Sequence, residues 1–136
     1  MKKVYVSLVA DLLHAGHISV LREAQKHGNV IVGLLTSTAI NELKDTAYLK
    51  YQQRLAVIES LQMVSEVVPQ DTASYRSNLL RLKPDYVVHG DDWINGSQAN
   101  YRREVIDLLG QWGGELIEIK YSSDISDHNI KDQLMR

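Results

Sequence analysis

The chain has no cysteine and no apolar run long enough to cross a membrane. Without cysteine it can form no disulfide, which suits a reducing compartment. A membrane-spanning helix needs about 18 consecutive apolar residues, and the short apolar run after Met1-Lys2-Lys3 is also too brief for a signal peptide. We therefore expect a cytoplasmic protein with no membrane partner.

The chain also lacks an excess of either charge. Its formal net charge is −2, and acidic and basic residues are interspersed along the 136 residues. A broad basic surface for nucleic acid or anionic lipid is therefore excluded, and any anion must be bound locally. The length is typical of one domain, and no linker or internal repeat divides it, so we expect a single domain over residues 1–136.

Apolar runs alternate with helical patterns along the whole chain. Short runs typical of buried strands lie at residues 4–9, 29–35, 64–68, 85–89 and 116–119. Helical spacing is found at residues 16–26, 39–43, 52–63, 74–82 and 98–112, and near 129–135. Parallel strands need crossovers, which are usually helices. The pattern predicts a doubly wound, Rossmann-like α/β fold, with a five-stranded parallel sheet covered on both faces.

Two histidines mark the turn after the first predicted strand. His14 and His17 are three residues apart where the first helix begins, so both can project to one side of its first turn. A helix N-terminus offers unpaired N–H groups and partial positive charge, which favours phosphate. Gly16 between them lets backbone and ligand approach closely. The spacing favours a phosphate site beyond the carboxyl end of the strand.

Two other interpretations of these histidines remain open. They can be an incidental, partly buried pair, or they can belong to a metal site. A zinc site needs at least a third ligand, and the candidates of suitable type are Asp11, His89 and His128. We expect no metal held by protein side chains alone.

Two segments resemble a known superfamily. Ala10-Asp11-Leu12-Leu13-His14-Ala15-Gly16-His17 is similar to the first motif of the cytidylyltransferase-like nucleotidyltransferases. Class I aminoacyl-tRNA synthetases and pantetheine-phosphate adenylyltransferases have a similar turn, but this chain is too short for a tRNA-binding apparatus. Val87-Val88-His89-Gly90-Asp91-Asp92-Trp93 resembles glycerol-3-phosphate cytidylyltransferases and the cytidylyltransferase domains associated with phosphoenolpyruvate mutase.

Further segments are closer to the mutase-associated domains, which belong to phosphonate metabolism. These are Tyr48-Leu49-Lys50-Tyr51-Gln52-Gln53-Arg54 and Trp112-Gly113-Gly114-Glu115-Leu116. The resemblance implies transfer of CMP from CTP to a small phosphonate or alcohol phosphate, with release of pyrophosphate. It also implies Mg²⁺ bound with the nucleotide phosphates, and a homodimer.

The same resemblance implies roles for individual residues. The catalytic residues are His14, His17 and Lys44, and Arg54 faces the anionic group of the acceptor. The nucleotide-binding residues are Val9, Ala10, Asp11, Gly16, Gly90, Asp91, Asp92, Trp93 and Ser126. Structural alternatives are a solvated loop for Lys44, a helix surface for Arg54 and packing for Trp93. His89 is interpreted as a core or rim histidine without a chemical role.

The sequence departs from the family at two places. Asp127 and His128 follow Ser126 where the family carries small hydroxyl residues, and Ser7-Leu8-Val9 lacks the glycine that commonly precedes the first motif. A carboxylate at this place repels phosphate unless it faces away or meets Mg²⁺. Three alternatives therefore stay open: a regulatory nucleotide-binding module with little or no turnover, an adenylyltransferase, and a metal-dependent phosphate-binding enzyme.

Overall fold

The computed structural model describes residues 1–120. Its strands are β1 (Lys3–Leu8), β2 (Asn29–Leu35), β3 (Glu66–Gln70), β4 (Tyr86–Gly90) and β5 (Glu115–Ile119). Its helices are α1 (Ala15–Gln25), α2 (Ser37–Glu42), α3 (Tyr51–Glu59), α4 (Arg76–Leu82) and α5 (Ala99–Gly110), with a 3₁₀ turn over Asp91–Trp93. The predicted alternation of strands and helices is confirmed over this range.

Some boundaries differ from the prediction. The strand expected at residues 64–68 lies at 66–70 and includes Pro69. Proline is tolerated there because β3 is an edge strand. The helix expected over residues 52–63 ends at Glu59, and the helix expected near 129–135 lies outside the described residues. None of the helices in the described part of the chain is long and apolar enough to cross a membrane.

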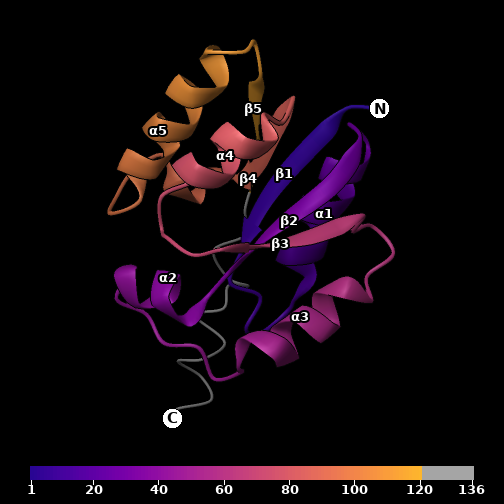
Figure 1. Cartoon of the computed structure of the whole chain (residues 1–136), viewed down its shortest axis with the longest axis vertical. Coiled ribbons are helices and arrows are strands. Elements are labelled where there is room, and N and C mark those ends of the chain that lie inside the picture. The colour runs from indigo at the N-terminus through magenta and orange to yellow at the C-terminus, as the bar shows by residue number, and fades with distance from the viewer. Residues whose placement is uncertain (121–136) are drawn as a thin grey trace.

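The sheet is parallel throughout, with the strand order β3-β2-β1-β4-β5. The chain runs outward from β1 to β3 and then returns to place β4 on the other side of β1 (Figure 1). The strand order therefore reverses between β1 and β4. This is the doubly wound arrangement that the sequence predicts, and ligands bind at such a reversal.

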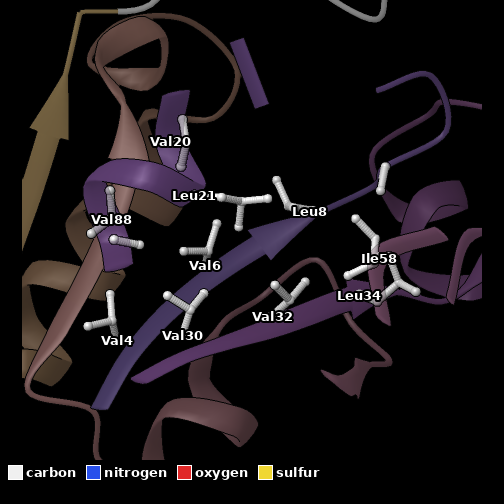
Figure 2. Packing of buried hydrophobic residues seen from close by; sticks show 12 residues of the cluster. Val4, Val6, Leu8, Val20, Leu21, Val30, Val32, Leu34, Ile58 and Val88 are labelled. Atoms are coloured by element: carbon white, nitrogen blue, oxygen red, sulfur yellow. The ribbon is translucent and has the colours of Figure 1, made fainter. Parts of the chain in front are cut away.

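Alternating residues of the strands build separate cores on the two faces of the sheet. Val4, Val6 and Leu8 of β1 share one core with Val20 and Leu21 of α1 and Ile58 of α3; Figure 2 shows these side chains. Tyr5, between them, points to the opposite face. The first core consists of Val4, Val6, Leu8, Ala10, Val20, Leu21, Ala24, Val30, Val32, Leu34, Ile58 and Val88. The second consists of Tyr5, Ile31, Val68, Tyr75, Leu79, Val87, Trp93, Val105, Leu108 and Leu109.

The two neighbours of β1 pair with it over different lengths. Pairing with β2 continues along β1 to its last residue, Leu8. Pairing with β4 ends at Tyr5, which lies opposite Val87. The carboxyl ends of β1 and β4 are thus not joined by the ladder, and they leave room for a cavity where the strand order reverses.

Candidate active site

A cavity of about 300 Å³ lies at the carboxyl ends of the strands. It is lined by Val6, Ser7, Leu8, Val9, His17, Val20, Leu35, Leu43, Asp45, Gln70, Ala73, Tyr75, Val88, His89, Gly90, Asp92, Gln98 and Tyr101. Four predicted site residues are among them: Val9, His17, Gly90 and Asp92. The structure therefore brings the turn after β1 and the turn after β4 to one cavity.

The two histidines of the first turn cap the N-terminus of α1. The Gly16 N–H donates to His14 Nδ1 at 3.0 Å, and the His14 N–H donates to His17 Nδ1 at 3.2 Å. The ring centroids lie 4.1 Å apart. A nitrogen that accepts a backbone N–H carries no proton, so the neutral form of each ring has its proton on Nε2. The cap thereby sets both imidazoles as Nε2–H donors.

Burial keeps one of these histidines uncharged. His17 is 9% exposed, and its burial lowers its pKa from 6.5 to about 4. The imidazole at the cavity wall is therefore a neutral N–H donor at neutral pH. Such a donor can stabilise charge that develops on a phosphate during reaction.

Asp11 holds the loop after α2 against the first turn. Ala10 has φ 56°, a left-handed conformation that alanine rarely adopts, and Asp11 follows it. The Asp11 carboxylate is 2% exposed and accepts the N–H groups of Tyr48 and Leu49, both at 2.8 Å. In this structure Asp11 orders the loop that carries Lys44, and direct binding of a nucleotide by Ala10 or Asp11 stays a prediction.

Arg54 joins the carboxyl ends of two strands. Its side chain is fully buried. Nη1 donates to the carbonyls of Val9 at 2.9 Å and Leu35 at 2.6 Å, and Nε donates to the Leu49 carbonyl at 3.1 Å. The surface alternative for Arg54 is therefore wrong. Its Nη2 is buried without a hydrogen-bond partner among the described residues, and contact with an acceptor stays a prediction.

The turn after β4 contains one buried and several exposed residues. Asp91 and Asp92 are exposed, and Gly90 and Asp92 line the cavity. The Trp93 ring is 2% exposed and its Nε1 donates to Glu118 Oε2 at 2.7 Å. This burial matches the packing alternative for Trp93. The ring does not line the cavity, so any influence on a ligand passes through its neighbours.

Several cavity residues were not predicted from the sequence. His89 lines the cavity, although it was interpreted as a histidine without a chemical role. Its position directly before Gly90, at the end of a strand, was an available signal. Gln70 and Tyr75 also line the cavity, but they come from segments with no recognisable motif.

Gln70 is fixed by a buried polar network beneath the cavity. The Tyr5 hydroxyl donates to Gln70 Oε1 at 2.5 Å and accepts from Asn78 Nδ2 at 3.0 Å. Gly33 makes room for this network, because a Cβ at Gly33 would lie 1.7 Å from Tyr5 Oη. The floor of the site thus depends on contacts between residues distant in sequence.

The remaining predicted residues lie around the cavity or beyond the described range. Lys44 is exposed and has φ 58°, and its neighbours Leu43 and Asp45 line the cavity. Gly16 lies in the first turn of α1, and its N–H is used in the His14 cap. Contact of Lys44 with phosphate stays a prediction. Ser126, Asp127 and His128 lie outside the described residues.

The described lining of the cavity carries acidic but no basic side chains of lysine or arginine. Asp45 and Asp92 are its carboxylates. No group of three or more His, Cys, Asp or Glu side chains in residues 1–120 is placed to hold a metal ion. A polyphosphate in this cavity therefore requires positive charge that it brings with it or receives from the rim.

The parallel sheet, the cavity at its reversal point and the histidine-capped helix define a Rossmann-like domain of the nucleotidyltransferase type. The sequence model of the cytidylyltransferase-like family matches residues 9–132. The chain belongs to the cytidylyltransferase-like family, and it is a nucleotidyltransferase.

Curated relatives include two glycerol-3-phosphate cytidylyltransferases. That of Staphylococcus aureus is 29% identical over 136 residues, which cover 98% of this chain and 96% of the relative. That of Bacillus subtilis is 34% identical over 95 residues, 68% of this chain and 74% of the relative. The bifunctional protein HldE of Blochmanniella floridana is 31% identical over 98% of this chain, which spans only 27% of HldE.

Solved structures share the fold. The lipopolysaccharide core biosynthesis protein from Thermoplasma volcanium has a TM-score of 0.72 and 23% identity, over 90% of this chain and 97% of that one. Pantothenate synthetase from Thermus thermophilus has a TM-score of 0.59 and 14% identity, over 97% of this chain and 64% of that one. At these identities the likeness concerns the fold alone, and it supports the Rossmann-like class.

Proposed function

We propose that the chain is a CTP-dependent cytidylyltransferase that transfers CMP to a small phosphonate or alcohol phosphate and releases pyrophosphate. One observation carries this proposal: His14 and His17 are set by their caps as Nε2–H donors at the N-terminus of α1, beside the cavity. Donors of this kind suit a phosphate whose charge increases in the transition state. Family membership and the two glycerol-3-phosphate cytidylyltransferases support cytidylyl transfer.

The reaction is an in-line displacement at the α-phosphorus. An oxygen of the acceptor phosphonate or phosphate forms a bond to that phosphorus, and the bond to the oxygen bridging toward the β-phosphate breaks. Pyrophosphate leaves with the bonding electrons. The protein forms no covalent bond, so its task is to align two anions and to stabilise the developing charge. His14 and His17 do so as N–H donors, and the α1 N-terminus adds its partial positive charge.

Residues around the cavity have complementary tasks in this proposal. Gly90 and Asp92 lie at the wall formed by β4, where an aspartate oxygen can accept from the cytosine amino group. Lys44 lies next to lining residues and supplies the nearby positive charge that the described lining lacks. The resemblance assigns Arg54 to the anionic group of the acceptor. In this structure its guanidinium is fully buried outside the cavity lining, and Nη2 is its nitrogen without a partner among the described residues.

Mg²⁺ fits this arrangement as an ion bound with the nucleotide. The ion usually keeps several waters and uses substrate phosphates with one or two carboxylates. With Asp92 assigned to the base, Asp45 is the lining carboxylate that could hold it. When bound, the ion neutralises triphosphate charge. The acidic lining makes such neutralisation necessary.

The finer features of the proposal rest on sequence resemblance. The segments from Tyr48 to Arg54 and from Trp112 to Leu116 favour a phosphonate acceptor. The homodimer and the cytoplasmic location are part of the same proposal. Size-exclusion chromatography with light scattering tests the dimer, for which we expect twice the mass of the 15.4 kDa chain.

The proposal is tested by measuring pyrophosphate release. The protein is incubated with Mg²⁺, each of the four nucleoside triphosphates, and a panel of short phosphonates and alcohol phosphates. We expect release with CTP and a phosphonate, and its loss in His17→Ala. His27→Ala is the matched control, because His27 pairs with Glu23 at the far end of α1. Pyrophosphate release with ATP and an acceptor, but not with the other three nucleotides, would make the chain an adenylyltransferase. Nucleotide binding without pyrophosphate release in any pairing would favour a regulatory module.

A further inference from the structure

His89 differs from the other cavity histidine in how its ring is bonded. Its Nδ1 lies 2.7 Å from the carbonyl oxygen of Gly90. A carbonyl can only accept, so Nδ1 carries the proton. Burial lowers the pKa of His89, although the Gly90 carbonyl and Asp92 oppose the shift. The neutral ring therefore has an unprotonated Nε2, which is a hydrogen-bond acceptor, whereas His17 is set as an Nε2–H donor.

A series of side-chain contacts fixes the position of the His89 ring. It stacks on Trp93 with ring centroids 3.6 Å apart and an interplanar angle of 6°. Trp93 Nε1 donates to Glu118 at 2.7 Å. Arg102 in turn donates to both Glu118 oxygens, at 3.0 and 2.9 Å. These contacts link α5 and β5, which lie beside each other in Figure 1, to the wall of the cavity.

The composition of the cavity indicates which part of a substrate meets this wall. His89 and Tyr101 give it flat, uncharged rings, Asp92 adds a carboxylate, and the described lining offers no lysine or arginine. A phosphonate or a phosphate is disfavoured next to a carboxylate and an unprotonated nitrogen. A neutral, planar nucleoside with N–H and O–H donors suits the same surface.

We propose that His89 is a specificity-determining residue whose Nε2 accepts a hydrogen bond from an N–H or O–H group of the nucleoside. The donor is the exocyclic amino group of the base or a ribose hydroxyl. Trp93, Glu118 and Arg102 are positioning residues, because they fix the ring without lining the cavity. The inference rests on the proposed function, since it takes the nucleotide as the ligand of this cavity.

Binding of nucleotide analogues tests this role. The dissociation constants of CTP, UTP, 2′-deoxy-CTP and 3′-deoxy-CTP are measured by calorimetry with Mg²⁺, for the wild type, His89→Leu and His89→Gln. We expect His89→Leu to weaken CTP about tenfold, which corresponds to loss of one hydrogen bond. We expect His89→Leu to leave unchanged the dissociation constant of the one analogue that lacks the donor group. That analogue is UTP for the base amino group and a deoxynucleotide for a ribose hydroxyl.

Two further variants separate hydrogen bonding from packing. His89→Gln keeps an acceptor oxygen, so we expect it to recover most of the affinity for CTP. His27→Leu removes a histidine outside the cavity and is expected to leave all four dissociation constants unchanged. Equal weakening of all four nucleotides by His89→Leu, or no weakening of any, would overturn the assignment.

The outcome also separates this inference from the proposed function. A wild type that binds CTP but forms no product with any acceptor refutes the transfer reaction, while the four dissociation constants still decide the role of His89. If the wild type turns over CTP but discriminates among the four nucleotides no better than His89→Leu does, the role of His89 is refuted and the transfer reaction is not. A wild type that binds none of the four nucleotides overturns both.

Discussion

The turn after β1 and the rest of the cavity wall are built in different ways. In the first turn, His14, Gly16 and His17 bond to one another within four residues of sequence. At the wall formed by β4, His89 stacks on Trp93, and Trp93 donates to a β5 carboxylate, Glu118, which is 25 residues further along the chain. Local contacts set the proton donors of the first turn. At His89 the adjacent Gly90 carbonyl sets the acceptor nitrogen, and long-range contacts hold the Trp93 ring on which His89 stacks. A single motif can therefore encode half of such a site, while the other half depends on the whole fold.

The largest effect is expected from the locally built turn. His17→Ala removes a neutral N–H donor from the cavity, and loss of one such donor lowers kcat by about 100- to 1,000-fold. It also removes the acceptor of the His14 N–H, which costs about 1 kcal/mol of unfolding free energy. Steady-state kinetics and chemical denaturation measure the two effects. A fall in kcat that merely tracks the unfolded fraction would show that His17 serves packing.

The next effect concerns the long-range contacts that close the site. Arg54→Met leaves the carbonyls of Val9, Leu35 and Leu49 without their donor, and we expect a loss of about 2–4 kcal/mol in urea denaturation. Arg103→Met is the control, because Arg103 is exposed on α5. Equal stability of the two variants would contradict the bonding described for Arg54.

A smaller effect is expected at the floor of the cavity. Gly33→Ala places a methyl group against the Tyr5 hydroxyl, which must move and disturb its bond to Gln70. We expect a loss of about 1–3 kcal/mol in thermal or chemical unfolding. Gly110→Ala is the control, since a Cβ built at Gly110 meets nothing within 4 Å beyond its chain neighbours and the nearby backbone of its own helix. A fully stable Gly33→Ala would show that the network beneath the cavity is loosely packed.

The smallest effect is a pH dependence of stability. The pKa of His17 is about 4 in the folded chain and 6.5 without burial, so the unfolded chain binds the extra proton between these values. The contribution of His17 to the unfolding free energy is therefore complete above pH 6.5. It falls as the pH drops toward 4, by about 1 kcal/mol between pH 6.5 and 5.5. His17→Gln cannot titrate, and its unfolding free energy should fall by about 1 kcal/mol less over this interval. Identical slopes for both proteins would refute the buried neutral imidazole.

The same contrast explains what the sequence could predict. Apolar runs and helical spacing depend on neighbouring residues, so the five parallel strands and the helix that follows the first strand were predicted. The capping bonds of His14 and His17 were not. Arg54 was open to interpretation as a surface residue, because the carbonyls that it bonds come from the ends of β1 and β2 and from the loop before α3. The sequence does not reveal the role of His89, because its acceptor nitrogen follows from a bond to the Gly90 carbonyl and the position of its ring from a stack on Trp93. The position of His89 at the end of a strand indicates that it lies near the cavity, but spacing alone does not show which bonds either residue makes.

The most direct measurement follows the label of radioactive CTP in the presence of Mg²⁺ and a short phosphonate. With the label on the α-phosphorus, we predict that it appears in the product formed with the acceptor. With the label on the γ-phosphorus, we predict that it appears in pyrophosphate, and that His17→Ala prevents both. Transfer of the γ-label to the acceptor, or nucleotide binding with neither label moving for any acceptor, would contradict cytidylyl transfer by this chain.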